Sequence, residues 1–137
     1  MNNVLVATRK KEELVPFLEL SGFMVEPVSE TIHKVTRDGE LPVFVSATDK
    51  NMYFEVDLGN VSEFANEELY FKLLDLNTEV LPVSFGINNS NPQDPRLVLI
   101  ESRETDDLSD QELLAVFDAL ELATDRAEAL LSEYMAN

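Results

Sequence analysis

The chain has 137 residues, a net charge of −17 at pH 7, 45% hydrophobic residues and no cysteine. The acidic excess disfavours binding to nucleic acid and to anionic membranes, because both are themselves negatively charged. Without cysteine the chain forms no disulfide and no cysteine-ligated metal site, and its length favours a single domain, residues 1–137.

The N-terminal half is predicted to contain one helix followed by an antiparallel meander of strands. The apolar run at residues 4–7 is too short for an export signal or a membrane span, so we expect a cytoplasmic protein without direct membrane insertion. Residues 9–20 have helical periodicity, in which Pro16 predicts a kink or a late start. Strands are expected at 23–26 (stopped by Pro27), 31–37, 41–48 and 52–58, with a two-residue hairpin turn at Asp38-Gly39.

The C-terminal half is predicted to add two helices and two strands. A helix is expected over 63–76, and strands over 81–87 and 96–103 are separated by the polar loop 88–95. From Ser109 to Tyr134 apolar residues recur at steps of three and four, which predicts one long amphipathic helix. The element order predicts an α+β fold, a two-layer sandwich in which helices pack on an antiparallel β-sheet of about five strands.

Few residues offer catalytic or metal-binding chemistry. His33 is the only histidine, and its place on a predicted strand favours a structural role. Glu104-Thr105-Asp106-Asp107 is the densest acidic cluster, and it most simply serves the N-terminus of the last helix. We therefore expect no enzyme, no cofactor and no metal site. Two alternatives stay open: a regulator that binds a small molecule or cation through a carboxylate cluster, and a hydrolase with paired acids, which would need a concave site holding a carboxylate of raised pKa.

Two surfaces are candidates for binding a partner. The last helix carries several acids but only one base, Arg126, so its outer face is either a solvated surface or a docking site for a basic segment. The residues predicted for that docking site are Asp118, Glu121, Asp125 and Glu128. Two strands that begin with proline are either ordinary strand starts or line an edge or groove that accepts a partner, through Pro42, Phe44, Pro82 and Phe85.

Three segments carry a resemblance to a known family. Leu41 to Ser46, Leu81 to Ile87, and the closing helix with Phe117 and Glu121 are similar to a family of short, uncharacterised bacterial proteins encoded beside relatives of phage shock protein A. The similarity covers roughly residues 38–130, and the strand 96–103 departs from it by offering only aliphatic residues where the family has aromatic ones.

The element order also resembles the type III secretion chaperone-like fold, whose members are small, acidic, cytoplasmic homodimers that bind partner polypeptides. The two resemblances imply a protein partner, with a phage shock protein A-like coiled coil as the candidate, and no catalytic residues. We therefore expect a non-catalytic, cytoplasmic, homodimeric adaptor or chaperone-like protein.

Overall fold

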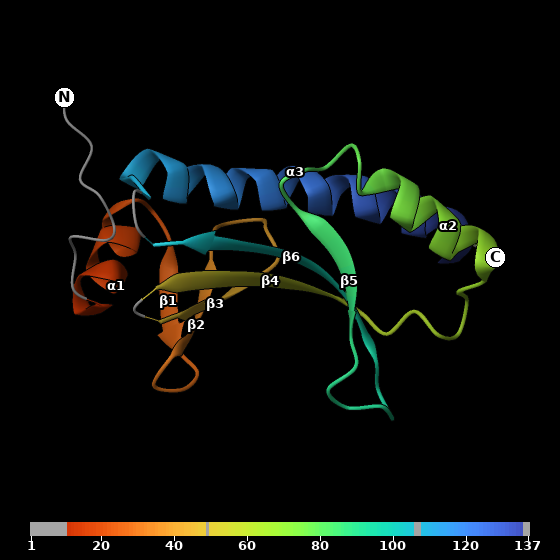
Figure 1. Ribbon diagram of the computed structural model, residues 1–137, viewed down its shortest axis with the longest axis horizontal. Helices are drawn as coiled ribbons and strands as arrows, with labels where there is room; N and C mark the ends of the chain where they lie inside the picture. The colour runs from red at the N-terminus through yellow and green to blue at the C-terminus, as the bar shows by residue number, and fades with distance from the viewer. Residues whose placement is uncertain (1–10, 49, 106–107, 136–137) are drawn as a thin grey trace.

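The computed structural model describes residues 11–48, 50–105 and 108–135 (Figure 1). Along this part of the chain the elements are α1 (Lys11–Leu20), β1 (Met24–Pro27), β2 (Ile32–Thr36), β3 (Val43–Ala47), β4 (Asn51–Gly59), α2 (Glu67–Leu76), β5 (Ser84–Asn88), β6 (Arg96–Glu104) and α3 (Asp110–Met135). The strands form one six-stranded sheet in the order β1-β2-β3-β4-β6-β5, and every neighbouring pair is antiparallel. The predicted α+β fold, with an antiparallel sheet and a long C-terminal helix, is confirmed, with one strand more than the expected five.

The core lies between the sheet and α3, which runs along one face of the sheet (Figure 1). Met52, Phe54 and Val56 alternate along β4 and are almost completely buried, as expected for a strand with one face on the core. The ring of Phe54 meets Phe117 of α3 edge-on, with 5.7 Å between the ring centroids. Other buried residues of α3 continue this contact along the helix: Leu113, Val116, Leu120, Ala123, Ala127 and Leu131.

The caps of α2 and α3 explain where these helices begin. Ser109 and Glu112 each accept a hydrogen bond from the other residue's backbone N–H, both at 3.1 Å, so the two residues form a capping box at the start of α3. Helix α2 starts at Glu67, four residues later than predicted, because the side chain of Asn66 caps it by accepting a hydrogen bond from the backbone N–H of Leu69 at 2.8 Å.

Several predicted boundaries are wrong for identifiable reasons. The Asp38-Gly39 turn is not a two-residue hairpin, because β2 ends at Thr36 and β3 begins at Val43, leaving a longer connection. Strand β1 includes Pro27 instead of stopping before it, which is tolerated because β1 is an edge strand that can spare a donor. At Leu58 the pairing of β4 with β6 is irregular, and this residue is only partly buried against the core.

Two predicted segments contain a proline. Helix α1 contains Pro16 in its interior, and residues 9 and 10 of the predicted helix lie outside the described residues. Strand β5 begins at Ser84, so Leu81 and Pro82, which are joined by a cis peptide bond, precede the strand. Val83, just before β5, and Phe85 on it are buried, whereas Ile87 is half exposed.

Candidate functional site

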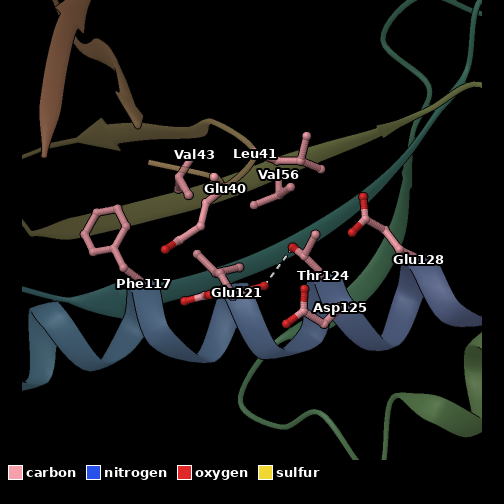
Figure 2. Close-up of a pocket in the computed structure, with 11 residues that line it drawn as sticks. Glu40, Leu41, Val43, Val56, Phe117, Glu121, Thr124, Asp125 and Glu128 are labelled. Atoms are coloured by element: carbon pink, nitrogen blue, oxygen red, sulfur yellow. Dashed lines mark hydrogen bonds between the residues drawn. The ribbon is translucent and has the colours of Figure 1, made fainter. Parts of the chain in front are cut away.

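A groove opens between α3 and the connection from β2 to β3, and we call it the α3 groove (Figure 2). Its volume is about 200 Å³. The floor is apolar and the rim is acidic, because α3 presents its buried stripe to the sheet and its charged residues to solvent. Its lining residues are Gly39, Glu40, Leu41, Val43, Val56, Phe117, Leu120, Glu121, Thr124, Asp125 and Glu128.

Arg37, at the start of the β2–β3 connection, links this connection to α3 at one end of the groove. Its guanidinium donates to Glu40 at 2.7 and 3.1 Å, and it also donates to Asp118 at 3.1 Å and to Glu121 at 3.3 Å on α3. The same guanidinium lies 4.9 Å above the ring of Phe23. One arginine therefore joins three carboxylates and positions the connection against the helix.

The acids in this cluster outnumber the base, and Figure 2 shows Glu40 extending from the connection toward Glu121. The neighbouring Glu40 carboxylate is the main cause of the raised pKa of Glu121, and partial burial adds to the shift, while Arg37 opposes it. Protonation of Glu121 is therefore more favourable in the folded protein than protonation of an isolated glutamate.

We expect Glu121→Gln to raise the midpoint of thermal unfolding at pH 7. The pKa of Glu121 is higher in the folded than in the unfolded state, so stability from this group is present at low pH and is lost as pH rises from about 4.5 through the raised pKa. The difference between variant and parent should therefore vanish on acidification below 4.5. Thermal melts of the variant and the parent at several pH values measure this difference in midpoint. In a Glu40→Gln background the substitution should no longer stabilise, and a lower midpoint for Glu121→Gln alone at pH 7 would mean that Arg37 outweighs Glu40.

The structure brings three of the four predicted helix acids together on the α3 groove. Glu121, Asp125 and Glu128 line it, and Asp118 stands beside it in its ion pair with Arg37. Asp125 and Glu128 are exposed. The interpretation of this helix face as one acidic surface gains a geometric basis, since the acids border a concave, apolar floor.

The four strand residues do not share one groove. Strand β3 lies inside the sheet, so it offers no free edge, and Phe44 is half-buried on the face opposite Val43 and Val45. Phe85 lies on β5, which is an edge strand as the prediction allows, but its side chain is buried in the core. Pro82 is exposed before β5, and Pro42 is half-buried before β3. Strands β3 and β5 are separated by β4 and β6, so the two proline-headed segments lie apart.

Sequence reasoning missed Arg37, Glu40 and Leu41 as parts of the site. They lie on the β2–β3 connection, and the contacts of Arg37 with α3 join residues 81 and 84 positions apart in the chain. The only available signal is the placement of a base and an acid around Asp38-Gly39, which is ordinary for a turn.

The α3 groove offers little for catalysis. Glu121 meets one criterion of a paired-acid hydrolase, a raised pKa in a concave site. However, Arg37 already contacts both Glu40 and Glu121, the Thr124 hydroxyl donates to the Leu120 carbonyl at 2.7 Å, and the volume is below the roughly 300 Å³ at which small-molecule pockets begin.

The described residues contain neither a metal-binding cluster nor a membrane-spanning helix. Residues 11–48, 50–105 and 108–135 contain no group of three or more His, Asp or Glu side chains arranged to hold a metal ion. His33 lies on β2 opposite Val45 and Pro27, as expected for a strand histidine. Of the acidic cluster before α3, Asp106 and Asp107 lie outside the described residues. None of the helices in the described ranges is both long enough and apolar enough to cross a bilayer.

Comparison with known proteins identifies the fold. Neither a protein-family model nor a curated protein sequence matches this chain. Its structure is similar to a chain of the heterodimeric ExoU–SpcU complex from the type III secretion system of Pseudomonas aeruginosa, with a TM-score of 0.68 and 18% identity over 85% of this chain and 96% of that one. It is also similar to E. coli YbjN, a candidate transcription regulator, with a TM-score of 0.61 and 14% identity over 93% and 95% of the two chains.

Proposed function

We propose that this chain is a non-catalytic, cytoplasmic adaptor or chaperone-like protein whose α3 groove holds a basic segment of a partner polypeptide. The observation that carries the proposal is the composition of the groove, an apolar floor bordered by Glu40, Glu121, Asp125 and Glu128. A cationic segment gains electrostatic attraction at the rim and buries apolar side chains on the floor. A nucleic acid would instead be repelled.

The fold and the resemblance suggest which kind of partner to test first. The structural relative in the ExoU–SpcU complex occurs with a different polypeptide in a heterodimer, which is consistent with a role in binding other proteins. The sequence resemblance points to a phage shock protein A-like coiled coil as the candidate partner. Coiled coils often carry lysine together with glutamate at the positions that flank their apolar seam, so a lysine-rich stretch of such a helix would suit the groove.

Affinity capture from the native host at two ionic strengths tests the proposal. The tagged protein should retain one stoichiometric partner at about 0.05 M salt and release it at about 0.5 M, because an exposed charged interface is screened. Mass spectrometry then identifies the partner. A partner whose binding does not respond to salt, or an activity on small substrates that is lost in Glu121→Gln, would contradict the proposal.

We further propose that the protein is a homodimer that associates through the outer face of α2. Phe71 and Leu74 lie one turn apart on this helix and are 72% and 67% exposed, so two large apolar side chains face solvent side by side. Tyr70 beside them is 42% exposed. A second copy of α2 would bury the same residues symmetrically, as in other two-fold interfaces.

The dimer proposal makes a direct prediction about mass. The parent protein should elute with twice the mass of one chain in size-exclusion chromatography with light scattering, and Phe71→Glu/Leu74→Glu should elute as a monomer, because four charges would face one another across the interface. Leu20→Glu, at a position on α1 that is 89% exposed, is the control and should stay dimeric. A monomeric parent at high protein concentration would contradict the proposal.

A further inference from the structure

A second groove lies on the other flank of α3, between the helix and the segment that leads from α2 to β5. Its volume is about 310 Å³, larger than that of the α3 groove. The lining residues are Glu79, Val80, Leu81, Ala119, Leu122, Ala123, Asp125 and Arg126, and we call it the Leu122 notch. The small side chains of Ala119 and Ala123 leave the space that the surrounding residues enclose.

The border of the notch carries large apolar side chains that are exposed to solvent. Leu81 and Leu122 border it and are 70% and 67% exposed. Arg126, the one base among the lining residues, already pairs with Glu79 at 2.7 Å. The remaining charge at the notch is therefore the exposed carboxylate of Asp125, so the rim is acidic here as well.

Asp125 lines both the α3 groove and the Leu122 notch. The two depressions are thus separated only by the outer ridge of α3, on which Asp125 and Leu122 are neighbours three residues apart. A polypeptide that lies across this ridge would meet acids on one side and an apolar notch on the other.

We propose that the partner segment crosses α3 at Asp125, placing basic side chains along the α3 groove and one large apolar side chain in the Leu122 notch. This inference rests on the proposed function and specifies its partner as an amphipathic basic segment. Charge complementarity selects a cationic segment, since both depressions have acidic rims, and the exposed leucines select an apolar anchor.

The width of a helix sets the spacing in that segment. An α-helix with side chains is about 10 Å across, so the basic and apolar side chains must be separated by a similar distance. An extended segment covers this in about three residues, and a helical one in about seven. The recognised pattern is therefore Lys or Arg followed or preceded at one of these spacings by Leu, Ile, Met or Phe.

Selection from a random peptide library tests the pattern without knowledge of the natural partner. Peptides of about 15 residues, long enough to cross the ridge in either conformation, are selected on the parent protein. One enriched peptide is then synthesised, and its affinity is measured at low and high salt. The variants are Leu122→Asp for the notch, Asp125→Lys/Glu128→Lys for the groove, and Leu20→Asp as an exposed apolar control on α1.

We expect enriched peptides to contain both basic residues and one large apolar residue at a spacing given above. Leu122→Asp should weaken binding about 10-fold or more at both salt concentrations, because a buried apolar contact is not screened. The groove variant should weaken binding mainly at low salt, and Leu20→Asp should change it less than about 2-fold.

Other outcomes of the selection distinguish a failure of this inference from a failure of the proposed function. Basic peptides without an apolar anchor, bound equally well by Leu122→Asp, would overturn the crossing geometry and leave the α3 groove as the binding site. Apolar peptides insensitive to Asp125→Lys/Glu128→Lys would overturn both proposals, as would a selection that enriches no sequence.

Discussion

Reversing two charges at the α3 groove, in Asp125→Lys/Glu128→Lys, is expected to weaken binding of the captured partner by about 10- to 100-fold at low ionic strength. Each reversal replaces an attraction of about 0.5 kcal/mol with a repulsion of similar size, so the two reversals together cost about 2 kcal/mol. Both residues are exposed and stand outside the Arg37 network, so the fold should tolerate the change. Titration calorimetry with the purified partner measures the effect.

The matched control is Glu26→Lys/Glu63→Lys, which changes the net charge by the same amount at exposed positions on β1 and before α2. This control should lower affinity less than about 3-fold, because only the overall field of the protein changes. Equal losses in the two double variants would mean that net charge alone attracts the partner, and the groove would then have no specific role.

Phe54→Ala is expected to lower the free energy of unfolding by about 3–5 kcal/mol, the usual cost of deleting a fully buried aromatic ring. Phe54 is 0% exposed and packs against Phe117, so its loss would leave a cavity between the sheet and the floor of the α3 groove. Urea denaturation should give a lower midpoint with an unchanged slope.

Phe71→Ala, on the outer face of α2, is the comparison for the loss of stability expected in Phe54→Ala. Its ring is 72% exposed, so the substitution should cost less than about 0.5 kcal/mol when the protein is held below its association concentration. A cost below about 1 kcal/mol for Phe54→Ala would show that α3 is not packed on β4 as described.

Most of the fold could be predicted from the sequence because local periodicity decides it. Alternation along 52–58 and the apolar stripe of α3 have distinct periods, and each is fixed by one continuous segment. Boundaries were predicted less well, because long-range or cap contacts set them. The start of α2 depends on Asn66, and the inclusion of Pro27 depends on the place of β1 at the sheet edge.

The candidate site could be predicted only in part. Helical spacing alone places Glu121, Asp125 and Glu128 along one side of α3. The concavity could not be predicted, because the β2–β3 connection with Arg37 and Glu40 reaches α3 through the tertiary fold. The Leu122 notch escaped prediction for the same reason, since Leu81 comes from a segment that precedes β5.

Site-specific photo-crosslinking tests most directly whether the partner occupies the α3 groove. A photoreactive residue is introduced at Leu41, which lines the groove and is 38% exposed, and at Glu63, an exposed control position before α2. We predict that the partner captured at low salt is crosslinked from position 41 and not from position 63, and that the attached peptide is rich in Lys and Arg. A bound partner that crosslinks only from position 63, or through an acidic peptide, would contradict the assignment of the groove.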